Sequence, residues 1–599
     1  MDAIVQMKTA AMLRKLAGGD LQHIGGYPFA PQKKGLYYAE QELSPLPRST
    51  PELQGTDSGA VGGFFRALET YHPHGAMLLR HGKVIAEGYW SPWQKGYSNM
   101  VYSLSKSVTG MAVGLAVSEG LLRTDERLVD IFPEKTPRIR APRIDQITVE
   151  HLLTMSSGVH FNESASVLEK DWVRAALESD CAFAPGSRFF YNSINSYLLA
   201  AAVCRRAGMS LTQYLTPRLF SPMGLSPHWE TCPLGIEKGG WGLWLTLEEM
   251  AKLGQLMLQS GRWTINGESR QLLPAVWVER MREKKIYTES GICRDGYGYQ
   301  VWLCPFDGAY QFNGAYGQYV VILPEQDMVI AILSGERNMF ATGGVIAEIG
   351  RSFAKHSLSD RPLPPGTAAL RLARELRTLR AMPGPAVGIP AGSRTGAQAV
   401  QRYASPSRFT KVERSVHEKI YDFAPSICGL LPMALQCCRM NFTFGVQSVR
   451  IQFHKSSCTI YMREGDDAYA LECGLDGADR LSPVSIRGET FQTACAAVWA
   501  QDEFSRPKLI VYCRFIETPH TRIMSFLFDR DELHLRFTEW PRAADATKML
   551  VELVAGPGSR LDQLFTSVSQ REGIKRRICL LYTSPSPRDG ATSRMPSSA

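Results

Sequence analysis

The sequence predicts an α+β domain followed by a small all-β domain. With 599 residues, the chain is longer than a single hydrophobic core usually allows. Between about residues 45 and 358, strand patterns at both ends enclose a long stretch of helical patterns, which is typical of α+β domains. From about residue 405, short alternating segments with turn signals between them indicate a barrel or a sandwich.

The elements of the first domain follow from local signals. Ser49-Thr50-Pro51-Glu52 resembles a capping box with an early proline, so a helix is expected to start there. A β-hairpin is expected where residues 76–79 and 84–89 are separated by His81-Gly82-Lys83. The remaining expected elements are helices over 3–16, 107–119 and 246–260, strands over 298–304, 319–323 and 328–334, and a closing helix over 343–355.

The later part of the chain changes in character. Residues 359–404 are rich in proline, glycine and arginine, and we interpret them as a linker around a basic helical patch over 368–381. Residues 405–556 form the predicted β-rich domain, with strand candidates over 449–453, 509–515, 523–528 and 533–537. Residues 1–44 are taken as an N-terminal extension and 557–599 as a tail, which from about residue 580 resembles translated adapter sequence and is interpreted as non-native.

Composition excludes several classes of function. The net charge of +9 is a mild excess, and no basic stripe with interleaved aromatic residues indicates nucleic-acid binding. The 13 cysteines include no Cys-x-x-Cys pair, so we predict no metal site and a reducing compartment. No glycine-rich phosphate loop precedes a helix, so no nucleotide or other cofactor is expected. A chain without signal peptide or apolar run of about 18 residues is expected to be cytoplasmic and without a membrane span, provided that its start is complete.

A Ser-x-x-Lys spacing matters when the serine starts a helix, because the lysine then lies one turn further on the same face. The spacing occurs at Ser103/Lys106, Ser352/Lys355 and Ser505/Lys508. Ser505 lies in a predicted loop and Ser352 late in a predicted helix, whereas Ser103 opens a helix with a face of small residues. The first pair is therefore the candidate for chemistry, although small residues on a helix can equally reflect tight packing.

The order of several motifs now indicates a family. Tyr102-Ser103-Leu104-Ser105-Lys106-Ser107 resembles the first motif of the serine β-lactamase and penicillin-binding-protein superfamily, in its class C-like branch. Pro185-Gly186 followed by Tyr191-Asn192-Ser193 resembles the second motif, and Phe312-Asn313-Gly314-Ala315 before Tyr316-Gly317-Gln318 best matches the third. The resemblance covers about residues 45–358 and implies a β-lactamase-like domain, in which an antiparallel sheet is flanked by a helical region. Glu517-Thr518-Pro519 is similar, less specifically, to a β-rich extension of some bacterial serine hydrolases.

The resemblance implies a role for each matched residue. Ser103 is the expected nucleophile that forms an acyl-enzyme, Lys106 takes the serine proton, and Tyr191 relays protons to the leaving group. The backbone amides of Ser103 and Ala315 form the expected oxyanion hole. The expected substrate-binding residues are Asn192, Ser193, Phe312, Asn313, Gly314 and Tyr316. Taken singly, each of these residues also fits ordinary packing, so the expectation depends on their joint order.

One departure from the family pattern bears on the substrate. The third motif usually begins with a lysine or a histidine that binds a substrate carboxylate, but this chain has Phe312 there. Because a phenyl ring cannot pair with a carboxylate, we expect an esterase-like or amidase-like hydrolase acting on a small ester or amide. Six aromatic residues could line an apolar pocket, or equally pack in the core: Trp90, Trp93, Trp241, Trp244, Tyr297 and Trp302.

Two other hypotheses stay open at this point. The chain could be a β-lactamase or D-peptide hydrolase of the same superfamily, against which Phe312 argues. It could also be a catalytically silent scaffold whose C-terminal β-domain binds a partner, against which the complete set of Ser103, Lys106 and Tyr191 argues. The sequence does not determine the oligomeric state.

Overall fold

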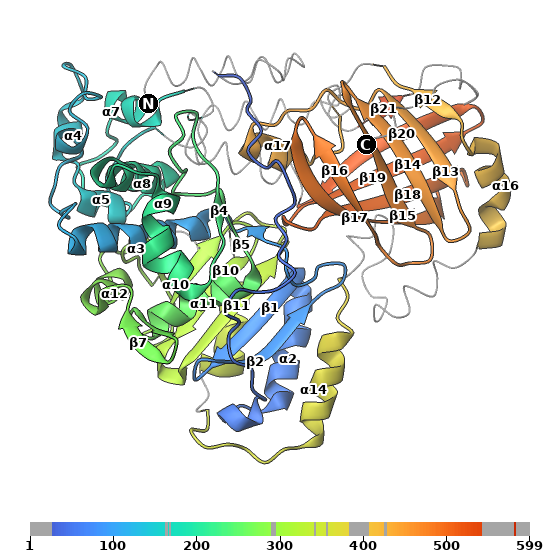
Figure 1. The fold of residues 1–599 in the computed structure, drawn as a ribbon. Coiled ribbons are helices and arrows are strands. Elements are labelled where there is room, and N and C mark those ends of the chain that lie inside the picture. The colour runs from blue at the N-terminus through green and yellow to red at the C-terminus, as the bar shows by residue number, and fades with distance from the viewer. Residues whose placement is uncertain are drawn as a thin grey trace. The chain divides into compact units, whose positions relative to one another are not determined.

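The computed structural model describes residues 27–161, 166, 169–288, 295–340, 343–354, 358–381, 406–424, 428–541 and 580–582. These residues belong to two compact units (Figure 1). The first unit contains residues 37–381, and the second contains residues 27–36 together with those from 406 onward. The expected helix over 3–16 lies outside the described residues. The domain boundaries proposed from the sequence stay a prediction.

A six-stranded antiparallel sheet forms the centre of the first unit, with strand order β2-β1-β11-β10-β9-β8 (Figure 1). Its strands are β1 (Pro73–Arg80), β2 (Lys83–Tyr89), β8 (Trp302–Leu303), β9 (Tyr310–Gly314), β10 (Gln318–Leu323) and β11 (Met328–Ser334). The expected hairpin is β1–β2. The strand expected over 298–304 shrinks to β8, because Gln300 has a left-handed backbone with φ 61° and interrupts the extended conformation.

Both faces of this sheet are buried, because side chains alternate between two hydrophobic cores. Met77 and Leu79 of β1 pack into the core shared with α3 (Ser105–Ser118), α8 (Ser193–Ala207) and α11 (Leu247–Leu258). Ala76 and Leu78 point to the opposite core, shared with α2 (Ser58–Leu68), α13 (Gly344–Ile349) and α14 (Thr367–Arg377). The α+β class expected from the sequence is thus confirmed, with α3 next to the sheet as a central, almost fully buried helix.

The other elements of the first unit are short. They are η1 (Glu52–Gln54), η2 (Glu69–Tyr71), β3 (Asn99–Met100), η3 (Tyr102–Leu104), α4 (Leu128–Ile131), η4 (Pro142–Gln146), α5 (Val149–Leu153), α7 (Trp172–Glu178), α9 (Leu211–Leu215), η5 (Thr216–Phe220), α10 (Ser221–Met223), β4 (His228–Trp229), β5 (Leu243–Leu245), β6 (Arg262–Ile265), β7 (Glu268–Gln271), α12 (Ala275–Arg282), η6 (Pro324–Gln326) and η7 (Gly350–Ala354). Among the described residues, no helix is long and apolar enough to span a bilayer.

The first long helix begins later than the sequence pattern predicts. The Ser49–Glu52 segment leads only into the 3-10 turn η1, and Gly55 then adopts a left-handed conformation with φ 67°. Helix α2 starts at Ser58, where the side chain of Asp57 accepts a hydrogen bond from the amide of Ala60. The glycine therefore separates the apparent capping box from the true N-cap, Asp57.

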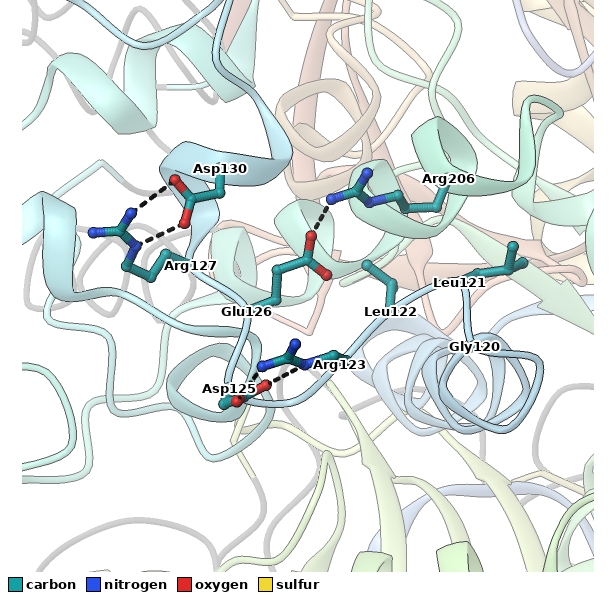
Figure 2. A pocket seen from close by; sticks show the side chains of 9 residues that line it. All are labelled: Gly120, Leu121, Leu122, Arg123, Asp125, Glu126, Arg127, Asp130 and Arg206. Carbon is teal, nitrogen blue, oxygen red and sulfur yellow. Dashed lines mark hydrogen bonds and ion pairs between the residues drawn. The ribbon is translucent and has the colours of Figure 1, made fainter.

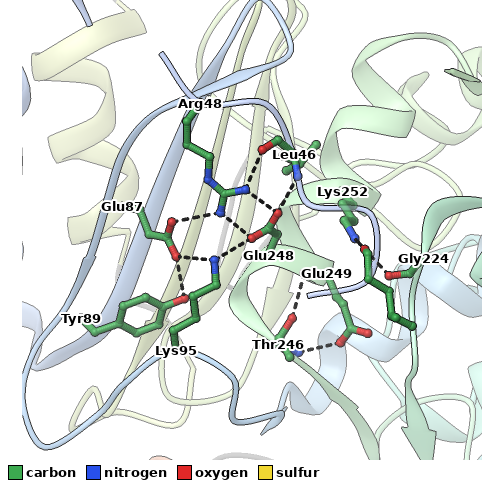
Figure 3. Close-up of polar contacts among 11 residues, drawn as sticks. Leu46, Arg48, Glu87, Tyr89, Lys95, Gly224, Thr246, Glu248, Glu249 and Lys252 are labelled. Atoms are coloured by element: carbon green, nitrogen blue, oxygen red, sulfur yellow. Dashed lines mark hydrogen bonds and ion pairs between the residues drawn. The ribbon is translucent and has the colours of Figure 1, made fainter. Parts of the chain in front are cut away.

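A buried ion-pair network holds the segment before η1 onto α11 and β2 (Figure 3). Glu248 is fully buried, and its carboxylate accepts hydrogen bonds from the Arg48 guanidinium at 2.5 and 2.8 Å and from the amide of Leu46 at 2.6 Å. Lys95 and Glu87 extend the network. Burial alone would raise the pKa of Glu248, but the bonds from Arg48 and Leu46 lower it to about 2.

The second unit is built around a ten-stranded, almost entirely antiparallel sheet that is nearly closed (Figure 1). Its strand path is β12-β13-β14-β15-β17-β18-β19-β20-β21, and β16 pairs with β17 beside that path. The elements are α16 (Pro406–Val416), β12 (Ile420–Asp422), α17 (Met433–Arg439), β13 (Ser448–Phe453), β14 (Ser457–Glu464), β15 (Asp467–Gly474), β16 (Arg480–Ile486), β17 (Glu489–Gln501), β18 (Pro507–Phe515), β19 (Thr521–Asp529), β20 (Glu532–Trp540) and β21 (Leu580–Tyr582). The expected small all-β domain is confirmed as barrel-like.

Residues far apart in the sequence complete this unit. The amine of Lys33 lies 2.7 Å from the Glu517 carboxylate, and both side chains are almost fully buried. The Lys33 carbonyl accepts a hydrogen bond from the Thr490 amide at 2.9 Å, and the Lys33 amine donates one to the Thr490 carbonyl at 2.6 Å. At the other end of the chain, β21 pairs with β20, although the sequence interpretation excluded residues from about 580. Its three apolar residues continue the open edge of β20.

Candidate active site

Ser103 lies in the 3-10 turn η3, directly before α3, and its side chain is half-buried. The preceding Tyr102 has a left-handed backbone with φ 50°, an uncommon conformation for an aromatic residue. Lys106 follows on the first turn of α3, which begins at Ser105. Ser103 therefore lies in the turn that leads into the helix rather than in the helix itself.

Lys106 is buried, with 1% of its surface exposed, and its amine contacts three oxygen atoms. The Nζ atom lies 2.9 Å from the Ser103 hydroxyl, 2.7 Å from the Ser193 hydroxyl and 2.7 Å from the Gly240 carbonyl. A lysine ammonium has three N–H donors, so these acceptors match its capacity. The contacts fix the amine beside the serine oxygen rather than letting it extend into solvent.

The contact between Lys106 and Gly240 was not foreseen from the sequence. A Cβ atom on Gly240 would lie 2.6 Å from the Ser193 carbonyl, so only glycine allows this approach to α8. The Thr109 hydroxyl of α3 donates to the neighbouring Gly239 carbonyl at 2.8 Å. The Gly239–Gly240 segment is thus held against α3 beside Lys106. In the sequence, only its glycines indicated such a close approach.

The three residues of the second motif point in different directions. Ser193 contacts Lys106, as described, and begins α8. Asn192 is 1% exposed: its amide donates to the carbonyls of Val159 and Phe161, and its oxygen caps α8 by accepting from the Ile194 amide. These hydrogen bonds all join Asn192 to the protein backbone, which places it in a structural position rather than at an open surface.

The ring of Tyr191 lies over Lys106, with its centroid 4.9 Å from the Nζ atom. It stacks on Trp302 at 5.4 Å and belongs to a cluster with Phe189, Met155 and Tyr297. We call the aromatic members of this cluster, Phe189, Tyr191, Tyr297 and Trp302, the aromatic wall. Burial raises the pKa of Tyr297, which keeps that hydroxyl protonated.

Of the six aromatic residues proposed for a pocket, Tyr297 and Trp302 belong to the aromatic wall. The others lie elsewhere. Trp90 stacks on Phe65 in the core on the opposite face of the sheet, and Trp93 stacks on His74. Trp244 is fully buried and Trp241 stacks on Trp172. Their spacing in the sequence could not reveal this, because aromatic residues serve cores and pockets alike.

The third motif lies on β9 and in the loop that follows it. Phe312 is fully buried in the core that contains α3, and Asn313 points to the other face, where its amide donates to Gln311 at 3.3 Å. The sequence suggested that Gly314 lets the strand approach a substrate. In the structure it lets β9 approach η3, because a Cβ atom there would lie 2.1 Å from the Val101 carbonyl.

The loop after β9 is braced against the same turn. Tyr316 has φ 62° and packs edge-on against Tyr102, with ring centroids 5.5 Å apart. The Gln318 amide donates to the carbonyls of Ala315 and Tyr316. Ala315, the expected oxyanion residue, is half-exposed. The loop that carries Ala315 is therefore fixed relative to the turn that carries Ser103.

A buried carboxyl group lies behind this loop. The amide of Glu336 donates to the Tyr316 carbonyl at 2.9 Å, and the Tyr319 hydroxyl donates to the Glu336 carboxyl at 3.1 Å. A Cβ atom on Gly317 would lie 2.9 Å from the Glu336 side chain. Burial raises the pKa of Glu336 to about 7 despite the bond from Tyr319. The sequence analysis did not identify this residue, because a glutamate after a strand is typical of a surface charge.

Other parts of the described chain offer less. Among the residues that the structure describes, no group of three or more histidine, cysteine or acidic side chains could hold a metal ion. An open pocket beside α4 has every lining arginine paired with a lining carboxylate, as Figure 2 shows for Arg123–Asp125, Arg127–Asp130 and Arg206–Glu126. These charges neutralise one another, and the pocket includes no residue of the Ser103 site.

Comparison with known proteins gives consistent matches for the first unit. Residues 65–342 match the family model described as Beta-lactamase. A beta-lactamase of Escherichia coli (strain K12) is 28% identical over 143 residues, which are 23% of this chain and 37% of that protein. The 6-aminohexanoate-dimer hydrolase of Paenarthrobacter ureafaciens is 24% identical over 290 residues, covering 43% of this chain and 71% of that protein.

The Esterase EstB of Burkholderia gladioli is 25% identical over 171 residues, covering 25% of this chain and 43% of that protein. The chain therefore spans less than half the length of two of these three relatives. The matched range, residues 65–342, contains Ser103, Lys106, Tyr191 and the third motif. The residues that carry this site accordingly match the Beta-lactamase family and are similar to the serine β-lactamase and penicillin-binding-protein-like superfamily.

Proposed function

We propose that the protein is a serine hydrolase that cleaves a small ester or amide through an acyl-enzyme on Ser103. One observation supports this most directly. The Lys106 amine is buried, lies 2.9 Å from the Ser103 hydroxyl, and is held there by Ser193 and Gly240. A nucleophile within hydrogen-bonding distance of a base, with the base oriented by further groups, is the arrangement that covalent catalysis requires.

The proposed reaction has two halves. In acylation, the Ser103 oxygen attacks the carbonyl carbon, Lys106 accepts the hydroxyl proton, and the bond to the alcohol or amine breaks as that group takes up a proton. In deacylation, a water molecule attacks the Ser103 ester, and the acid leaves while the serine recovers its proton. Lys106 must give up a proton before it can act as a base, so its desolvated position is relevant to the mechanism.

Tyr191 and two backbone amides complete the proposal. Tyr191, whose ring lies over Lys106, is proposed to pass the proton to the leaving group and to help activate the water. The amides of Ser103 and Ala315 are proposed to bind the oxyanion of the tetrahedral intermediate. The braced loop around Ala315 supports this role, since a preorganised donor costs no rearrangement during the reaction.

The proposed substrate carries an uncharged acyl group. Phe312, in the position where the family has a basic residue, is fully buried and offers no cation for a carboxylate. The aromatic wall beside Tyr191 favours an apolar acyl group over a charged one. The relative named as an esterase is in line with this preference.

The test measures hydrolysis of p-nitrophenyl butyrate and of the matching p-nitroanilide by the full chain and by its Ser103→Ala variant. We expect the variant to lose at least about 1000-fold in kcat. The matched control is Ser505→Ala, which removes the exposed serine of another Ser-x-x-Lys sequence and should keep full activity. Full activity in Ser103→Ala would refute the assignment of the nucleophile.

A second readout separates a failed substrate from a failed site. A fluorophosphonate should label the wild type on the peptide that contains Ser103, and Lys106→Met should slow this labelling. Labelling on a different serine would contradict the proposal even if neither chromogenic substrate is cleaved. A chromogenic cephalosporin should be hydrolysed much more slowly than the butyrate ester.

A further inference from the structure

Four cysteines lie side by side across neighbouring strands of the second unit. Cys458 of β14 is opposite Cys473 of β15, Cys473 is opposite Cys495 of β17, and Cys495 is opposite Cys513 of β18. All four side chains are fully buried and point to the inner side of the sheet. We call this set the cysteine row.

The row does not suit a metal ion. Strands two places apart in a sheet are about 9–10 Å apart, whereas thiolates that share a zinc ion at about 2.3 Å must lie within about 4 Å of each other. The geometry therefore favours chemistry between adjacent pairs of thiols.

The pair Cys495–Cys513 has the spacing that a disulfide needs. The β17–β18 register runs without a shift from Thr493↔Phe515 to Gln501↔Pro507. Beyond it, the Asp502 amide donates to the Arg506 carbonyl at 3.1 Å, which marks a hydrogen-bonded pair. Along an antiparallel ladder, hydrogen-bonded and non-hydrogen-bonded pairs alternate. Cys495 lies an odd number of residues before Asp502, so Cys495 and Cys513 form a non-hydrogen-bonded pair. The Cα atoms of such pairs are about 4.5 Å apart, within the range of about 4.4–6.8 Å found for disulfides.

Cys495 also lies where the sheet is most weakly joined. The parallel ladder between β15 and β17 has only two residue pairs, Cys473↔Cys495 and Gly474↔Ala496. The part of β17 from its first residue, Glu489, to Cys495 pairs instead with β16, where Arg480 lies opposite Cys495. Such a short ladder opens at a lower free-energy cost than the nine-pair ladder between β17 and β18. Local opening of this short ladder would let a small oxidant reach Cys495 without unfolding the whole unit.

We propose that Cys495 and Cys513 are a redox-active dithiol that a hydroperoxide oxidises to a disulfide joining β17 and β18. The Cys495 sulfur attacks the peroxide oxygen and forms a sulfenic acid, and the alcohol or water leaves. The Cys513 sulfur then attacks the Cys495 sulfur, the S–S bond forms, and the second oxygen leaves as water. The peroxide gains the two electrons that the thiols lose. This inference is independent of the proposed hydrolase function.

The disulfide should change the stability of the unit in a defined way. It would close a loop that contains the turn between β17 and β18, and such loops restrict the unfolded chain more than the folded one. Because the pair already lies side by side, the folded state needs little rearrangement. Oxidised protein should therefore unfold at a higher temperature than reduced protein, and a thiol reductant should reverse the shift.

The experiment treats the folded full chain with tert-butyl hydroperoxide, blocks the remaining thiols with N-ethylmaleimide in denaturant, and maps peptides without reduction. We expect one linked pair of peptides, containing Cys495 and Cys513, which dithiothreitol separates. Cys458→Ser removes a cysteine from the same row and should keep the linked pair, whereas Cys513→Ser should abolish it.

The outcomes decide the proposal in each case. A link between Cys473 and Cys495, a link that persists in Cys513→Ser, or no link in the folded wild type would overturn it. If Cys513→Ser does not fold, the peptide map of the wild type still identifies the pair. Chymotryptic cleavage at Phe504, an exposed residue between the two cysteines, gives a second reading, because the oxidised fragments should stay joined.

Discussion

The hydroxyl of Ser193 lies 2.7 Å from the Lys106 amine. Both groups are buried, so the bond is protected from competing water. We predict that Ser193→Ala lowers kcat for p-nitrophenyl butyrate by about 10- to 100-fold, the equivalent of one hydrogen bond to a charged group. The loss should appear in kcat rather than in KM, because Ser193 holds the proposed base and not the substrate.

Ser226→Ala serves as the control for this variant. Ser226 lies outside the site, and its backbone amide, not its side chain, makes the contact with Glu249. Its kcat should equal that of the wild type. An unchanged kcat in Ser193→Ala would show that Lys106 is positioned without this hydroxyl.

We predict that Gly314→Ala pushes β9, which carries the third motif, away from the turn that carries Ser103. The added Cβ atom would lie 2.1 Å from the Val101 carbonyl, and neither backbone can move aside by a rotamer change. We expect β9 and η3 to shift apart, with a loss of about 100-fold in kcat, as misplacements near 1 Å typically cause. Steady-state kinetics and the rate of fluorophosphonate labelling both measure this.

Gly366→Ala is the matched substitution, since a Cβ atom at this position would have nothing within 4 Å. It should change neither activity nor labelling. If Gly314→Ala remained fully active, the contact with Val101 would not be needed to align the site.

Glu336 should make the stability of the first unit depend on pH. Its pKa is raised to about 7 by burial, so the folded chain binds this proton more tightly than the unfolded chain does. Its contribution to the free energy of unfolding is fully present below about pH 4.5 and is lost as the pH rises through about 7, by on the order of 3 kcal/mol. Melting temperatures of the wild type and of Glu336→Gln between pH 5 and pH 8 test this.

The glutamine variant keeps the shape and cannot ionise. Its melting temperature should fall less than that of the wild type as the pH rises from about 5 to about 8. Parallel curves for the two proteins would rule out titration of Glu336 in this range. The variant also reports on Ala315, because the carboxyl lies behind the loop that carries this residue.

The contribution of Glu248 to the stability of the folded chain should depend on pH in the opposite sense to that of Glu336. Its pKa is lowered to about 2, so its stabilising contribution is present above about pH 4.5 and is lost as the pH falls toward 2. Glu248 is buried whereas Arg48 is 36% exposed and also contacts Glu87, so Glu248→Gln chiefly weakens the hydrogen bonds to the carboxylate and should cost about 1–3 kcal/mol at neutral pH. Glu279→Gln breaks an exposed pair with Arg282 and should cost less than about 1 kcal/mol. Denaturant unfolding of both variants compares the two costs.

The sequence predicted the first unit well where the signals were local. The hairpin of β1 and β2 and the helices α3 and α11 depend on short spacings in the sequence. Asn192 and Phe312 show the limit. Both lie in motifs that indicate substrate contact, yet one caps α8 and the other packs in the core, because the motif fixes the backbone and not every side chain.

Other features depend on contacts that no local pattern encodes. Gly240 reaches Lys106 only because α8 and the Gly240 loop meet in space, and Glu336 lies behind the third motif for the same reason. Strand β17 was not predicted, because the small residues of Thr493–Ala497 lack a clear alternation of polar and apolar side chains. The pairing of β14, β15, β17 and β18 likewise became visible only in the structure.

The buried contact of Lys33 with Thr490 and Glu517 has a consequence for synthesis of the chain. Lys33 and Thr490 are 457 residues apart, and at about 5–20 residues per second the ribosome needs roughly 20–90 s to make the chain between them. During this interval neither Thr490 nor Glu517 exists, so the Lys33 side chain stays hydrated and its segment cannot yet dock on the barrel. The barrel can therefore close over this lysine only at a late stage of translation or after it, and a stalled or shortened nascent chain would keep the segment around Lys33 accessible to proteases and chaperones.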